Sequence, residues 1–234
     1  MKNILSTLLI SVLFIGCSEN RVDVYELTNK GSKLSPLMYY QGKLFNGIGF
    51  DLHPNGQLRN EGSYINGKEN GVFKDWYENG QLKYEGSFIN NEKDGLHKEW
   101  HENGQFRYEG SFINGDKDGL HKLWDENGQL RHEENYINGE KNGVFKEWYE
   151  SGGLMFEGNF IDGKLDGIYK EWYDLKILTE VCSELKGSSY SQLKHELSFK
   201  DGKREGPWKA YYENGQLKTK GVYDNDQLIW RSKY

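Results

Sequence analysis

The chain of 234 residues carries 30 Lys and Arg residues against 36 Asp and Glu residues, for a formal net charge of −6 at pH 7. Nucleic acids and anionic lipid surfaces are recognised through clustered basic side chains, whereas the lysines here are interleaved with acids. Neither is therefore expected as the main partner, and the composition indicates a solvated surface of mixed charge.

The N-terminus has the features of an export signal. Lys2 precedes an apolar run at residues 4–15, which is too short to span a bilayer as a stable helix and fits the hydrophobic core of a secretory signal. The following Gly16-Cys17 resembles the lipobox of bacterial lipoproteins, although Phe14 stands where such signals favour leucine. This resemblance implies removal of residues 1–16 and a lipid on Cys17, which would anchor the chain in the cell envelope at the outer membrane or its periplasmic face. The alternative is an ordinary secretory signal and a secreted protein.

Residues 17–36 are expected to be a lipid-anchored tether, polar apart from a candidate capping strand at 22–27. Residues 37–234 form the repeat domain. Its first unit is atypical, as terminal repeats are when they cover the end of a stack. Its last strand is expected around 228–230, where Arg231 and Lys233 would blunt the open edge.

A frame of Asn-Gly-Gln followed by an apolar and a basic residue recurs every 24 residues, which indicates one supersecondary unit stacked many times. The frame begins at Asn55, Asn79, Asn103 and Asn127, degenerates at Ser151 and returns at Asn214. Residues 82–89 alternate apolar and polar side chains with period two, and the run at 95–100 is too short for a helix. Asn79-Gly80 between such runs is a strong hairpin signal. The sequence therefore predicts an all-β fold of stacked antiparallel hairpins.

The register of the hairpin can be argued from charge. A two-residue loop at Asn79-Gly80 would split the apolar residues between the faces, so a three-residue loop with a left-handed Gly80 is preferred. This register sets Trp76 opposite Leu82, Lys74 opposite Tyr84, Val72 opposite Gly86, Asp75 opposite Lys83, Glu99 opposite Arg107, His97 opposite Glu109 and His121 opposite Glu133. One face is then expected to carry the Trp, Leu, Tyr, Phe and Val side chains, and the other face the charges.

The units resemble the MORN repeat, whose pattern is a Tyr-Glu-Gly strand, an aromatic residue, an Asn-Gly turn and a further glycine. Residues 84–90 and Gly95 carry this pattern, while residues 76–82 are closer to the bacterial MORN-variant repeat of YwqK-like proteins, often described as an antitoxin family. The pattern is departed from at Asn91, at Glu134 and through an insertion at 175–192. Over residues 37–229 the resemblance implies an elongated single-layer antiparallel β-meander, built from MORN-like hairpin repeats and used for binding. It supplies no catalytic residue.

The insertion at 175–192 replaces an ordinary three-residue turn, and such a segment either carries function or has drifted neutrally. It contains Cys182, which has no disulfide partner in the chain once Cys17 is lipidated. His195 lies nearby in sequence, but a nucleophile also needs a base that a third group orients, and none is evident. We therefore expect Cys182 to be a buried spectator.

Metal sites are not expected either. His97 and His121 lie two strands apart, about 10 Å, which is too far to share one ion. The acids Asp94, Asp118 and Asp166 occupy a turn slot that asparagine fills in other units, so turn chemistry explains them without calcium. The sequence thus predicts no enzyme activity, no catalytic residue and no cofactor.

The aromatic side chains form the candidate binding face. It comprises Trp76, Trp100, Trp124, Trp148, Trp172, Tyr84 and Tyr108. In a single-layer sheet these rings must pack on one another, with strand glycines such as Gly86 as notches that receive the tryptophans. The stripe is expected to be chiefly core, with a protein-binding groove or stacking on sugars as an added role.

The expected function is a non-catalytic repeat scaffold of the bacterial cell envelope that binds an unknown protein partner and reaches the membrane through Cys17. Two alternatives stay open. One is an antitoxin or immunity role, in which the array occludes a toxin, and the other is binding of an envelope glycan such as peptidoglycan. No nucleic-acid partner is expected.

Overall fold

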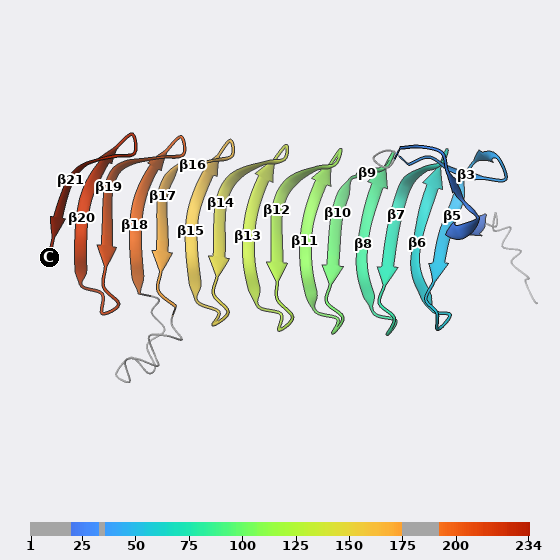
Figure 1. Cartoon of the computed structure of the whole chain (residues 1–234), viewed down its shortest axis with the longest axis horizontal. Coiled ribbons are helices and arrows are strands. Elements are labelled where there is room, and N and C mark those ends of the chain that lie inside the picture. Colours follow the sequence, from blue (N-terminus) through green and yellow to red (C-terminus); the bar gives the residue numbers. More distant parts are fainter. Residues whose placement is uncertain (1–19, 33–35, 175–191) are drawn as a thin grey trace, which may run out of the picture.

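The computed structural model describes residues 20–32, 36–174 and 192–234, and these form an elongated array of strands (Figure 1). The strands are β1 (Arg21–Asp23), β2 (Thr28–Asn29), β3 (Met38–Tyr40), β4 (Lys43–Leu44), β5 (Gly47–Leu52), β6 (Leu58–Ile65), β7 (Lys68–Trp76), β8 (Leu82–Ile89), β9 (Glu92–Lys93), β10 (Gly95–Trp100), β11 (Phe106–Ile113), β12 (Asp116–Trp124), β13 (Leu130–Ile137), β14 (Glu140–Trp148), β15 (Leu154–Ile161), β16 (Lys164–Leu165), β17 (Gly167–Trp172), β18 (Leu193–Lys200), β19 (Lys203–Tyr211), β20 (Leu217–Asp224) and β21 (Gln227–Lys233). One 3-10 turn, η1 (Val24–Glu26), follows β1. Over the described ranges, no helix is long and apolar enough to cross a membrane.

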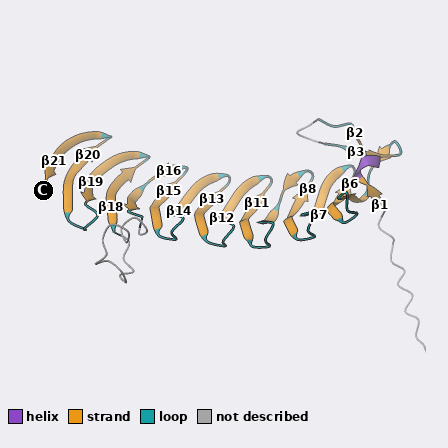
Figure 2. Ribbon diagram, turned by 60° about the horizontal axis from the view of Figure 1, so that its bottom comes forward, coloured by secondary structure: helices purple, strands orange, loops and turns teal. Residues whose placement is uncertain are grey.

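The topology is that of successive hairpins. Eighteen strands share one sheet, in which β5 to β21 pair antiparallel with their neighbours in sequence, while β2, β3 and β4 form a small separate sheet. Figure 2 shows the strands bowed into arcs along the array. This confirms the predicted all-β fold, an elongated single-layer antiparallel meander of hairpin repeats.

The ends of the array are closed differently. β1 pairs parallel with β5, and the Ile48 N–H donates to the Asn20 carbonyl at 2.9 Å. The strand that covers this end spans Arg21–Asp23, so it is shorter than the expected capping strand at 22–27 and begins one residue earlier. β21 spans the last strand expected around 228–230. β17 pairs directly with β18, so the ladder continues across the insertion; residues 175–191, including Cys182, lie outside the described residues.

Two kinds of turn alternate and form two rims. The short-turn rim uses two-residue type I′ turns such as Asn66-Gly67, with φ of 52° and 74°. The long-turn rim uses three-residue loops such as 78–80, where the N–H of Gly80 donates to the Tyr77 carbonyl at 2.9 Å and Gly80 has a φ of 84°. The predicted three-residue loop with a left-handed Gly80 is confirmed.

The predicted register is wrong beyond the first pair of each hairpin. Trp76 faces Leu82 as expected, but a β-bulge then leaves Lys83 without a facing residue, and Tyr84 faces Asp75. The shift pairs Lys74 with Glu85, Val72 with Ser87, Glu99 with Tyr108, His97 with Gly110 and His121 with Glu134. A slip of one residue moves every following side chain to the other face, so the expected separation of apolar and charged faces does not hold. The expected ion pair of Glu99 with Arg107 forms nonetheless, at 2.7 Å.

One face of the sheet, which we call the ring face, holds a ladder of contacting rings. From β6 to β13 it consists of Tyr64, Phe73, Phe88, His97, Phe112, His121 and Tyr136. Successive centroids lie 4.9–5.4 Å apart at interplanar angles of 64–76°. Such edge-to-face pairs stabilise by about 0.5–1.5 kcal/mol each beyond their burial, so the ladder is the core of this single layer.

Strand glycines make room for the ladder. A Cβ placed on Gly86 would collide with the His97 ring and the Tyr84 hydroxyl, and the same holds at Gly110 for His121. The expectation of glycine notches is right in kind, but the rings that fill them belong to the ladder. The tryptophans such as Trp76 lie on the opposite face, because Trp76 is an odd number of residues from Phe73 on the same regular strand.

The ladder changes character at Glu134, which stands where other units have Gly62, Gly86, Gly110 and Gly158. Its carboxylate accepts hydrogen bonds from the Tyr136 hydroxyl and from Lys141 Nζ at 2.6 Å. Burial alone would raise the pKa of Glu134, but these donors hold it below its usual value. The rings resume with Phe145 and Phe160, 5.8 Å apart.

His97 is a neutral member of the ladder and is 0% exposed. Its Nε2–H donates to the Ser87 carbonyl at 2.9 Å, so its Nδ1 is unprotonated and accepts from the Tyr84 hydroxyl at 2.6 Å. Burial, with a smaller effect of Lys93, lowers the pKa of His97 to about 4. His121 repeats this arrangement one unit later, and burial lowers its pKa as well.

Gly86→Ala is expected to lower the free energy of unfolding by about 1–3 kcal/mol, because the added methyl overpacks the ring ladder. Ser87→Ala, one residue away on the other face, should change it by less than about 0.5 kcal/mol. Urea unfolding of the full chain measures both. Equal effects of the two variants would show that no ring covers Gly86.

Stability should fall as the pH is lowered from about 6.5 towards 4, because the unfolded chain takes up a proton on His97 that the folded chain refuses. The slope from this residue approaches about 1.4 kcal/mol per pH unit and vanishes below the folded pKa. The double variant Tyr84→Phe/His97→Phe, which copies the phenylalanine of Phe73, should lose this part of the slope in urea titrations at several pH values. An unchanged slope would contradict a buried neutral imidazole.

Candidate binding surface

The face opposite the rings, which we call the mixed face, carries parallel rows of side chains across the strands. Its central row consists of the ion pairs Lys74–Glu85 (3.0 Å), Lys98–Glu109 (3.6 Å) and Lys122–Glu133 (3.5 Å). Tryptophans lie on the side of the long-turn rim and aliphatic residues on the side of the short-turn rim. The face expected to be charged is therefore amphipathic.

The aliphatic row contributes one exposed side chain from each of ten successive long strands. We call it the aliphatic band: Ile65, Val72, Ile89, Leu96, Ile113, Leu120, Ile137, Val144, Ile161 and Ile168. These side chains are 45–57% exposed. The spacing of about 4.8 Å between strands gives the band a length of about 43 Å.

The tryptophans line the other margin of the mixed face. Trp100 stacks on Phe106 at 5.5 Å, and Phe106 lies 5.8 Å from Trp124, so rings contact one another across neighbouring hairpins here as well. Lys98 of the ion-pair row lies over the Phe106 ring, which places the two rows on one face. The tryptophans Trp76, Trp100, Trp124, Trp148 and Trp172 are only partly buried. The two tyrosines grouped with them in the predicted binding face, Tyr84 and Tyr108, lie on the ring face instead, where they donate to His97 and His121.

The residues considered for catalysis or metal binding have structural partners. His195 Nδ1 lies 2.8 Å from Glu171, which also binds Lys194 at 2.5 Å. Asp94 and Asp166 accept backbone N–H groups of the next short turn. Among the residues that the structure describes, no three His, Cys, Asp or Glu side chains gather as a metal site would require.

The long-turn rim is tied together by side chains that reach from one turn to the next. A ring at the turn donates to the backbone carbonyl that ends the next hairpin strand: His53 to Trp76 (2.9 Å), Tyr77 to Trp100 (2.8 Å), His101 to Trp124 (2.9 Å), Tyr149 to Trp172 (2.8 Å) and Tyr173 to Tyr211 (2.9 Å). A second tie runs from an asparagine amide to the next turn: Asn55 to Glu78 (3.0 Å), Asn79 to Glu102 (3.0 Å) and Asn103 to Glu126 (2.6 Å). These ties fix the spacing of the turns.

Among the turns that the structure describes, the junction at Asp125 lacks both ties. Asp125 stands in the position of the ring, and its carboxylate accepts from the N–H groups of Asn127 (2.9 Å) and Gln129 (3.0 Å) in its own turn. Leu123 also stands where Glu99 binds Arg107 two strands earlier. Within the described part of the chain, Arg131 therefore has no ion pair, and its Nη1 is buried without a hydrogen-bond partner.

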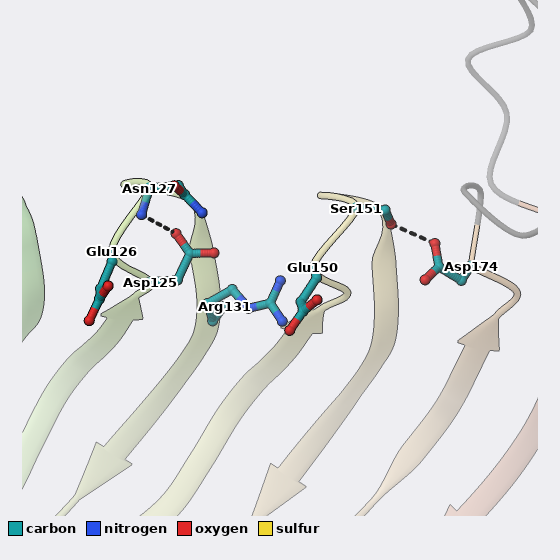
Figure 3. A pocket seen from close by; sticks show the side chains of 7 residues that line it. All are labelled: Asp125, Glu126, Asn127, Arg131, Glu150, Ser151 and Asp174. Carbon is teal, nitrogen blue, oxygen red and sulfur yellow. Dashed lines mark hydrogen bonds between the residues drawn. The ribbon is translucent and has the colours of Figure 1, made fainter.

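The missing ties leave a hollow of about 680 Å³ (Figure 3). It is lined by Asp125, Glu126, Asn127, Arg131, Glu150, Ser151 and Asp174. The corresponding space beside His53 and Tyr77, where the ring tie is present, measures about 350 Å³. In Figure 3, Arg131 points along the rim towards Glu150.

Sequence reasoning missed both the aliphatic band and the hollow. The band was hidden by the wrong register, which put Val72 and its equivalents on the ring side. The sequence did contain a signal for the hollow. The residue after each strand-ending tryptophan is Tyr or His, except after Trp124, where it is Asp125. Treating the repeats as equivalent concealed this single departure.

Comparison with known families places the repeats. The model of the MORN repeat variant matches residues 45–66, 69–90, 93–114, 117–138, 141–162 and 204–225, more than half of the chain. No curated protein matches this chain. The matched segments cover β5 to β15 and then β19 and β20, on both sides of the insertion. The chain belongs to the MORN repeat variant family.

Proposed function

We propose that this protein is a non-catalytic docking scaffold of the cell envelope, whose mixed face holds a protein partner along the aliphatic band. The observation that carries the proposal is the band itself, ten side chains that are each about half exposed on ten successive strands. Soluble monomers rarely expose contiguous apolar patches of this extent, and those that do generally use them for binding.

The neighbouring ion pairs suit the band to a protein partner. Lys74 and Glu85, and their equivalents, neutralise each other at the margin, so an apolar partner surface does not have to bury an unpaired charge. The ring ladder keeps the strands in fixed positions, so little ordering is needed on binding. A protein with complementary apolar residues over about 40 Å fits this surface.

The proposed lipid on Cys17 would hold one end of the array at the membrane. Only three residues separate Cys17 from β1, which pairs directly with β5. The array would therefore begin close to the bilayer and extend from it, rather than hang on a long tether.

Two alternative functions, an antitoxin role and glycan binding, can be distinguished from this proposal by experiment. In an antitoxin role the partner is a toxin, and loss of the scaffold would leave its cell unprotected. In a glycan-binding role the partly buried row of Trp100, Phe106 and Trp124 would stack on sugars, and Trp100→Ala would abolish glycan retention without unfolding the chain.

A photo-crosslinking residue at Leu96 or Leu120 is expected to capture one discrete protein from the native envelope. With that partner purified, Leu96→Asp/Leu120→Asp should weaken binding by about tenfold or more, because charge is forced into an apolar contact. The matched control Glu78→Gln/Glu102→Gln, on the long-turn rim, should stay within about twofold. Equal losses in both double variants, with both chains folded, would contradict docking on the band.

Cys17→Ser is expected to move the full-length protein from the membrane fraction to the soluble fraction, because the acyl chains supply the anchor. Fractionation with immunodetection checks this. Sedimentation of the serine variant with membranes, as for the unaltered chain, would refute the anchor while leaving the docking surface untouched.

A further inference from the structure

We propose that the hollow at Asp125 is a receptor for a tyrosine side chain presented by a basic segment of a partner protein. The hollow lies on the long-turn rim, away from the aliphatic band at the short-turn rim. The proposal therefore stands or falls separately from docking on the band.

At Asp125 the chain lacks the aromatic ring that lies beneath a basic side chain in other turns. In other hairpins the basic residue in the bulge lies over the ring of its own turn: Lys83 over Tyr77 (5.6 Å), Lys194 over Tyr173 (5.9 Å) and Lys218 over Tyr212 (5.2 Å). Arg131 is the equivalent basic residue, and the ring position of its turn is Asp125. A planar guanidinium pairs well with an aromatic face, so an external ring would supply the contact that the chain itself omits.

The ring tie to the next hairpin is absent at Asp125. Rings at residues 53, 77, 101 and 149 each donate to the carbonyl 23 residues later. At residue 125 the same relation points to the Trp148 carbonyl, which Asp125 does not reach because its carboxylate binds its own turn. A phenol hydroxyl placed as in the other turns would supply this donor.

The size of the hollow and an unpaired nitrogen of Arg131 also favour an external ring. The hollow is about 680 Å³ and extends from the Asp125 turn to Ser151 and Asp174, against about 350 Å³ for the space beside His53 and Tyr77, so it has room for an aromatic ring. Arg131 Nη1 is buried without a hydrogen-bond partner, which is costly until a ligand supplies one. Both features converge on the place where the other turns hold their own tyrosine or histidine.

The charge of the hollow determines which residues are favoured on either side of the partner's tyrosine. Asp125, Glu126 and Glu150 line the hollow beside the single cation Arg131, so its surroundings are net negative. A tyrosine between lysines or arginines is therefore favoured over one between acids. A phosphorylated tyrosine is disfavoured for the same reason, because it brings about two negative charges.

The test uses the full chain, isotope-labelled for NMR, and the capped tripeptides Lys-Tyr-Lys, Lys-Phe-Lys and Glu-Tyr-Glu. Lys-Tyr-Lys is expected to shift the amide signals of residues 125–131 and 149–151. Lys-Phe-Lys should bind about fivefold more weakly, because it lacks the hydroxyl donor. Asp125→Tyr, which restores the ring of the other turns, should abolish binding and raise the melting temperature, while His101→Tyr at the neighbouring filled junction should leave binding unchanged.

Arg131→Ala provides a second variant should Asp125→Tyr fail to fold, and it should weaken Lys-Tyr-Lys by about fivefold or more. The proposal is overturned if Lys-Tyr-Lys causes no shifts, if Lys-Phe-Lys binds equally well, or if binding persists in folded Asp125→Tyr. Tighter binding of Glu-Tyr-Glu than of Lys-Tyr-Lys would overturn the assignment of a basic partner.

Discussion

The structure depends on ring-to-ring packing along one side of a single sheet. A single layer has no second sheet to cover it, so its apolar side chains must bury one another. Phe88, His97 and Phe112 do so at centroid separations of 5.4 and 4.9 Å, above strand glycines that leave space for each ring. Each unit contacts mainly its two neighbours, so the stability of the array is close to a sum over neighbours, as in other repeat proteins.

One-sided packing explains what the other side can do. The rings bury one another and form the core on the ring face. The side chains of the mixed face therefore do not have to be buried, and its aliphatic band stays about half exposed. The ties between long turns act in a similar way, since each ring both fills space and fixes the next turn. Where Asp125 removes one ring, the backbone pairing of β13 with β14 continues and the rim has a hollow.

The fold was readable from the sequence because it depends on periodicity and on turn residues, and both are explicit. The 24-residue frame, the alternation at 82–89 and the left-handed Gly80 each predicted what the structure has. The faces were not readable, because the bulge at Lys83 carries no mark in composition: Lys83 looks like an ordinary strand residue, yet it shifts every later pair by one. The hollow was missed for the opposite reason, since reading the units as copies suppresses a change made only once.

The most direct test of the ring ladder is the NMR titration of the His97 and His121 imidazoles in the full chain. Both rings are predicted to carry their proton on Nε2 and to have a lowered pKa, with His97 titrating near pH 4. Ordinary titration near pH 6.5, with the proton shared between the two nitrogens, would place these rings in water. That result would contradict a core built on the ring face.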